Sequence, residues 1–190
     1  DPERMRKMVR EIKGFCGPEG AADESAIIDE SASEDRPGRP QPLARSIVAS
    51  RRNVDEFGKL LVSEAYWRGF AGAERQGFLG DGSDGNWGVW RTHFSTYTPI
   101  LDLIHGLTYV YAAAMAGQES KEGWRTYREW AQAVWGGRVA DVIAALELRQ
   151  QALGLPTDET SEPAPAAIVA KSLGYLRQQQ SRMNYPASRK

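Results

Sequence analysis

The sequence predicts an α/β protein that is mainly helical and has only a few short strands. Two short apolar runs, residues 77–80 and 98–101, are predicted to be strands, and an aspartate follows each of them. Much of the remaining chain carries apolar residues at helical spacing. The resulting order is helix, strand, helix, strand and then several helices, which is typical of a β-α-β unit. Because two strands are too few for a stable sheet, further strands are expected outside this chain or in segments that the pattern does not reveal.

Composition bounds the class of protein. The chain has 190 residues, of which 41% are hydrophobic and 26% charged, as in a soluble globular domain with a substantial core. The net charge of -1 gives no general attraction to nucleic acid, so any basic surface must be local. The single cysteine, Cys16, excludes an internal disulfide and indicates a reducing cytoplasm. No apolar run approaches the roughly 18 residues of a membrane span, so a cytoplasmic protein without a membrane partner is expected.

Two regions are distinguished along the chain. Residues 1–44 are expected to hold an N-terminal helix at 4–15 and a solvated, acidic and proline-rich insertion. Residues 45–190 are expected to form the main core. The chain begins with Asp1 instead of Met, which is compatible with a piece of a longer protein.

The helices of the main region are predicted from their apolar spacing. The first is expected to divide in two near Asn53, where a helix start with acids in its first turn is visible. Most of the six tryptophans are expected in the core, although base stacking is an alternative. The predicted helices are 45–68, 85–94, 102–115, 119–135, 138–153 and 166–185.

Asp81 is the first candidate site residue. It follows the strand at 77–80 and stands between two glycines, which permit a sharp turn and the close approach of an ion or a substrate. A carboxylate at the carboxyl end of a buried strand is a common metal ligand in α/β sheets. An aspartate–glycine turn that only ends the strand explains the same residues, and both interpretations stay open.

Asp102 and His105 are the second candidate pair. They follow the strand at 98–101, and their spacing places both side chains on one face of a first helical turn. They could brace an active site or assist a metal. The spacing alone favours an N-cap aspartate with a buried, hydrogen-bonded histidine. His93 is expected to be a packing residue.

The C-terminal segment is basic. No acid occurs from Pro163 onward, whereas Lys171, Arg177 and Arg182 lie in the last predicted helix. These three residues are candidate contacts to DNA phosphates. A solvated helix face is the competing interpretation.

Taken together, these segments resemble the catalytic core of bacterial insertion-sequence transposases of the DDE type, which have an RNase H-like fold. The matching stretches are residues 77–82 (GFLGDG), the aromatic residues Trp87, Trp90 and Phe94, and residues 99–107 (PILDLIHGL). Residues 181–186 (SRMNYP) are similar to the segment that precedes the family's last conserved block. The resemblance covers residues 53–190.

The resemblance implies two-metal phosphoryl transfer on DNA. Two Mg²⁺ (or Mn²⁺) ions roughly 3.5–4 Å apart would activate a water or a 3′-hydroxyl at a DNA phosphate. Asp81 would be the second catalytic acid and a metal ligand, and Asp102 and His105 would support the site. Transposon ends and target DNA would be the partners, and a homo-oligomer stays open.

The chain departs from the family pattern at both ends. No strand bearing the first catalytic aspartate is visible before Asp81, and Glu162 is the last acid, so the final glutamate is missing as well. The chain is therefore expected to be an excerpt or a truncated product, inactive in isolation. A non-catalytic helical interaction module is the alternative. A metal-dependent nuclease or phosphatase also fits, and it predicts that Asp81 and Asp102 lie close together and open to solvent.

Overall fold

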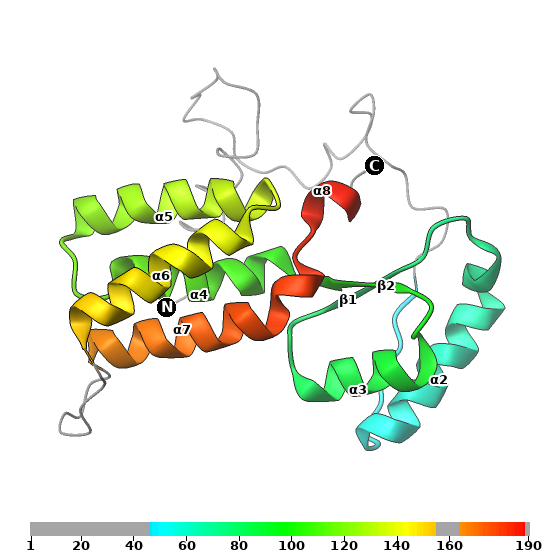
Figure 1. Ribbon diagram of the computed structural model, residues 1–190. Helices are drawn as coiled ribbons and strands as arrows, with labels where there is room; N and C mark the ends of the chain where they lie inside the picture. Colours follow the sequence, from blue (N-terminus) through cyan, green and yellow to red (C-terminus); the bar gives the residue numbers. More distant parts are fainter. Residues whose placement is uncertain (1–45, 155–163, 189–190) are drawn as a thin grey trace, which may run out of the picture. The chain divides into compact units, whose positions relative to one another are not determined.

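The computed structural model describes residues 46–154 and 164–188 (Figure 1). The predictions for residues 1–44, including the helix at 4–15 and Cys16, lie outside the described residues, as does most of the loop before the last long helix. The described part is mainly helical with two short parallel strands, which confirms a mixed, helix-rich α/β chain. The RNase H-like fold remains a prediction.

The strands and the helix between them form a β-α-β unit. β1 (Gly77–Gly80) and β2 (Thr98–Leu101) pair in parallel, and α3 (Asp84–His93) connects them. The register places Gly77 opposite Thr98 and Gly80 opposite Leu101. Both strands and the connecting helix therefore agree with the sequence prediction to within one or two residues at each end.

Aromatic side chains attach α3 to the strands. Trp87 is 1% exposed, and a Cβ at Gly80 would lie 3.1 Å from its ring, so the glycine permits the close packing. The rings of Phe78 and Phe94 are 5.5 Å apart. The indole N–H of Trp90 donates to the carbonyl of Tyr97 at 2.9 Å, which fixes the end of the helix against the chain that enters β2.

The first described helix, α2 (Val54–Trp67), is shorter than predicted. Residues 46–52 are not helical, so the expected helix at 45–68 is wrong in its first part. Asn53 is the N-cap, and its side chain accepts from the Glu56 amide at 2.9 Å, which starts the helix there. A short 3₁₀ turn, η2 (Phe70–Gly72), follows. A Cβ at Gly58 would lie 2.7 Å from the ring of half-buried His93, in keeping with a packing role for that histidine.

Four long helices form a bundle beside the strands (Figure 1). They are α4 (Leu103–Met115), α5 (Ser120–Trp135), α6 (Val139–Leu153) and α7 (Pro165–Gln179). Each packs on its chain neighbour, and α7 closes the ring against α4. The bundle core consists of fully buried aliphatic residues contributed by all four helices: Val110, Val134, Leu146, Val169 and Leu176.

The last predicted helix is interrupted. In place of one helix over 166–185, α7 ends at Gln179, and a 3₁₀ turn, η3 (Gln180–Arg182), leads to α8 (Tyr185–Ser188). Met183, next to this break, is fully buried, and its Cε lies 3.5 Å from the position of a Cβ on Gly106. The break therefore turns the chain so that Met183 packs against the first turns of α4.

The tryptophans are less buried than predicted. Trp87 is in the core, Trp90, Trp124, Trp130 and Trp135 are half-buried, and Trp67 is 82% exposed.

Of the helices in residues 46–154 and 164–188, none combines the length and apolar content that crossing a membrane requires.

Candidate functional site

The two candidate aspartates stand at neighbouring strand ends. Asp81 follows Gly80, Asp102 follows Leu101, and those two preceding residues are register partners. The Asp102 amide continues the ladder by donating to the Gly80 carbonyl at 2.7 Å. The parallel pairing therefore brings both aspartates to the same edge of the sheet.

Local hydrogen bonds hold the exposed carboxylate of Asp81. Its Oδ1 accepts from the Ser83 amide at 3.0 Å and from the Asn86 side-chain amide at 2.8 Å. The backbone N–H of Ser83, then the side chains of Ser83 and Asn86, lower the pKa of this carboxyl, and nearby His105 adds a smaller effect in the same direction. Asp81 is therefore ionised at neutral pH, and both of these bonds end on one of its two oxygens.

The backbone of the Asp81 turn is held from a distant part of the chain. The Tyr175 hydroxyl donates to the Asp81 carbonyl at 2.9 Å, and the Gln179 amide donates to the Gly82 carbonyl at 3.2 Å. Both residues lie one turn apart on α7. Neither was predicted from the sequence, although their spacing on one helix face is a visible signal.

Asp102 is the N-cap of α4. Its carboxylate accepts from the His105 amide at 3.0 Å, so the capping interpretation of this pair is confirmed for the aspartate. The His105 ring lies 5.8 Å from Tyr109 and 5.9 Å from Tyr175, and those two tyrosine rings stack at 3.7 Å. Burial, then the neighbouring Tyr109, Asp81 and Asp102, raise the pKa of Tyr175, which therefore stays protonated and able to donate.

The C-terminal segment packs behind Asp102. A Cβ at Gly106 would lie 3.7 Å from the hydroxyl of Tyr185, which is 5% exposed. Burial, with Asp102 as the next cause, raises the pKa of Tyr185. Tyr185, in the segment 181–186 that resembles a family segment, thus lies near Asp102.

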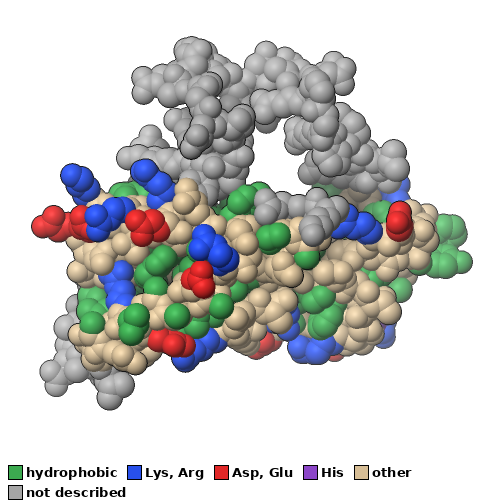
Figure 2. All heavy atoms as spheres, turned by 45° about the horizontal axis from the view of Figure 1, so that its top comes forward, with side chains coloured by type: hydrophobic (Ala, Val, Ile, Leu, Met, Phe, Trp, Pro, Cys, Tyr) green, Lys and Arg blue, Asp and Glu red, His purple; other side chains and the backbone are tan. Residues whose placement is uncertain are grey.

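The three predicted DNA contacts have different surroundings. Arg177 pairs with Glu147 at 2.6 Å, whereas Lys171 is exposed. The Arg182 guanidinium lies 4.4 Å from the centre of the Trp87 ring and donates to Gln179 at 2.8 Å. Lys and Arg side chains are interspersed with Asp and Glu on the face in Figure 2. DNA binding by these residues remains a prediction.

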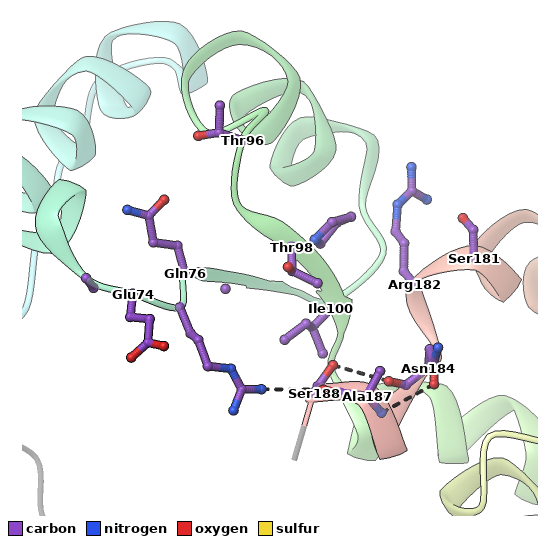
Figure 3. A pocket seen from close by; sticks show the side chains of 14 residues that line it. Glu74, Gln76, Thr96, Thr98, Ile100, Ser181, Arg182, Asn184, Ala187 and Ser188 are labelled. Atoms are coloured by element: carbon purple, nitrogen blue, oxygen red, sulfur yellow. Dashed lines mark hydrogen bonds between the residues drawn. The ribbon is translucent and has the colours of Figure 1, made fainter. Parts of the chain in front are cut away.

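A polar pocket of about 840 Å³ lies near the amino ends of the strands (Figure 3). Arg182 and Asn184 reach it from the C-terminal segment, and Gln76 and Thr98 from the strand starts. Neither Asp81 nor Asp102 lines it, so the pocket is separate from the strand end that bears the predicted acid.

The described residues do not form a complete metal centre. In residues 46–154 and 164–188, no three His, Cys, Asp or Glu side chains are grouped so as to hold a metal ion. The exposed, ionised Asp81 fits one Mg²⁺ ligand, because Mg²⁺ is commonly held by one or two carboxylates together with waters and phosphate oxygens. Asp102, whose carboxylate caps α4, fits a supporting role better than a primary ligand.

Comparison of the chain with protein-family models, curated proteins and solved structures gave no match.

Proposed function

We propose that this chain is the middle part of the catalytic core of a DDE-type DNA transposase. The observation that carries the proposal is the pair of aspartates at the adjoining carboxyl ends of two parallel strands. That is the edge at which α/β sheets bind ligands and metals. Residues 77–82 and 99–107, on which the family resemblance rests, are these strands and the turns after them.

The residues would divide the work as follows. Asp81 would hold a Mg²⁺ or Mn²⁺ ion, which supplies Lewis-acid activation of a water or a 3′-hydroxyl at a DNA phosphate. Asp102 would keep α4 and the end of β2 in place through its cap. Arg182 and Lys171 would approach the DNA backbone with exposed or partly exposed positive charge.

An incomplete sheet also supports this proposal. Parallel sheets are normally buried on both faces and contain more than two strands. Here the segment from Ile47 to β1, which includes α2, leaves large apolar side chains exposed. Figure 2 shows hydrophobic side chains on the surface at its right-hand end, the side on which Figure 1 places α2. The most exposed of them are Ile47, Tyr66, Trp67 and Leu79. Further strands and the missing catalytic acids would complete this side.

The helical interaction module remains the second candidate. It is favoured by one observation, namely that Asp81 and Asp102 both bond to local backbone amides, as simple turn and cap residues do.

The nuclease or phosphatase alternative expects both carboxylates open to solvent. Asp81 is exposed, but Asp102 is half-buried, which argues against that alternative.

The decisive experiment uses the flanking coding sequence. We expect an upstream strand ending in aspartate and a downstream helix bearing glutamate, and we expect the extended protein to cleave DNA ends in Mg²⁺. Asp81→Ala should abolish this cleavage, whereas Asp84→Ala, an exposed acid in the next helix, should leave it unchanged. The isolated chain should be inactive. Flanks that lack both acids, or cleavage that survives Asp81→Ala, would refute the proposal.

A further inference from the structure

We propose that Tyr175 and Gln179 on α7 are positioning residues for the turn that presents Asp81. The inference deepens the proposed function, on which it rests for the role of Asp81. It assigns to the helical bundle a task at the strand end, in addition to its own packing.

The first step is the pair of hydrogen bonds. Tyr175 and Gln179 donate to the carbonyls of Asp81 and Gly82, which are consecutive in the turn. The donors come from a helix that lies 94 and 97 residues further along the chain. Two consecutive carbonyls fixed from one rigid helix leave the turn little freedom to rotate, because each peptide plane is held by its own oxygen.

The second step is how closely α7 approaches. Gly82 has a φ of 92°, a backbone conformation that favours glycine. A Cβ at this position would lie 2.3 Å from the Tyr175 hydroxyl oxygen. The turn is thus shaped to admit the tyrosine, and no larger residue fits between them.

The third step is the support behind Gln179. This side chain is fully buried, and both ends of its amide are bonded, to the Gly82 carbonyl and to Arg182. Arg182 in turn lies over the Trp87 ring, which packs under Gly80. A buried amide retains such partners because leaving either unpaired is costly. Gln179, Arg182 and Trp87 therefore connect the Asp81 turn to Gly80, the last residue of the strand before Asp81.

The consequence is a link between α7 and the Asp81 carboxylate. The Ser83 amide that holds Asp81 belongs to the same turn as the two restrained carbonyls. Loss of the restraint should let the turn open more often and release that amide. The bundle would therefore help to set the direction in which Asp81 faces a metal or a substrate.

The test uses the full chain and two readouts. Tyr175→Phe keeps the ring that stacks on Tyr109 and removes the donating hydroxyl. Gln179→Met keeps the side-chain length and removes the amide. Tyr109→Phe is the matched control, since its hydroxyl lies outside this pair of hydrogen bonds. Hydrogen exchange at the Ser83 amide reports the turn, and line broadening by added Mn²⁺ at the amides of residues 82 and 83 reports metal at Asp81.

We expect the Ser83 amide to exchange about fivefold to tenfold faster in Tyr175→Phe and in Gln179→Met, as for the loss of one hydrogen bond. Tyr109→Phe should match the wild type, and amides in the core of α5 should be unchanged in all three variants. Unchanged Ser83 exchange in both α7 variants, or faster exchange throughout the chain, would overturn the inference.

The Mn²⁺ readout separates this inference from the proposed function. Broadening that disappears in Asp81→Asn and weakens in Tyr175→Phe supports both. No broadening in the wild type, together with faster Ser83 exchange in the α7 variants, counts against the metal role and leaves the positioning role standing. Equal broadening and equal Ser83 exchange in wild type and Tyr175→Phe overturns the positioning role alone.

Discussion

The segment from Ile47 to β1 leaves more of its large apolar side chains exposed than the four-helix region does. In the bundle, residues such as Val110, Val134 and Leu146 are fully buried. In α2 and β1, Trp67 and Leu79 are 82% and 64% exposed. The bundle closes its own core because each helix finds two neighbours in a ring. Each strand has one partner among the described residues, and Leu101 and Trp87 are buried there, whereas Leu79 is not.

This contrast shows where the candidate site stands. Asp81 and Asp102 lie at the junction, on strands from the open region and against helices from the closed one. The proposed function places the metal-binding acid at this junction.

The largest expected effect is a core truncation. Leu176→Ala in the bundle should lower the free energy of unfolding by about 3 kcal/mol, because Leu176 is fully buried and leaves a cavity. Leu79→Ala on the open side should change it by less than about 0.5 kcal/mol. Urea denaturation measures both. Similar losses for the two variants would mean that the open side is covered in solution.

The second prediction concerns the turn between the regions. Gly82→Ala should cost about 2 kcal/mol, because it combines a positive φ with a clash against Tyr175. Gly69→Ala is the matched control, since Gly69 also has a positive φ but faces open space. It should cost about 1 kcal/mol by thermal or chemical unfolding. Equal costs would mean that the approach of Tyr175 adds nothing to the strain.

The third prediction compares two helix caps. Asp102→Ala removes the cap of α4 and should destabilise the fold by about 1 kcal/mol. Asn53→Ala removes the equivalent cap of α2, whose surroundings bury fewer apolar groups, so hydrogen exchange should speed up in α2 with little change in the bundle. If Asn53→Ala sped up exchange in the bundle as well, the two regions would unfold as one unit.

The smallest expected effect is a pH dependence. The pKa of Asp81 is lower in the folded chain than in the unfolded one, so its contribution to stability is present above the unfolded pKa, at about pH 4. The contribution disappears as the pH falls through the folded pKa. Asp81→Asn should therefore make stability decline less steeply in acid. Asp84→Asn is the control, and the same change of slope in both variants would show that the Ser83 and Asn86 bonds do not hold Asp81.

The sequence predicted the elements better than their ends. The strands at 77–80 and 98–101 and the helix starts near Asn53 and Asp102 were visible because capping and glycine chemistry act over a few residues. The helix start at Asn53 was predicted and is confirmed, whereas the helix expected before it was wrong, because apolar spacing alone does not make residues 46–52 helical. The break after Gln179 was missed, because it depends on the packing of Met183 against α4.

The residues of the candidate site likewise include some that the sequence predicted and some that it did not. Asp81, Asp102 and His105 were found because each follows a strand that local sequence defines. Tyr175 and Gln179 were missed, since their spacing shows only that they share a helix face and not that this face reaches the Asp81 turn. The prediction that most tryptophans are buried was also wrong. Helical spacing shows which residues share a face of the helix, but it does not show whether another element covers that face.

The short-range features follow from the sequence: a helix-rich α/β chain, two aspartates placed after two strands, and the glycines of the first turn. Propensity, capping and alternation act between near neighbours, so they can be read along the chain. Tertiary structure alone decided that the strands pair in parallel, that the four helices close a bundle, and that α7 holds the Asp81 turn. Those contacts join residues far apart in sequence, and they form only when the burial of apolar surface brings the helices against the strands.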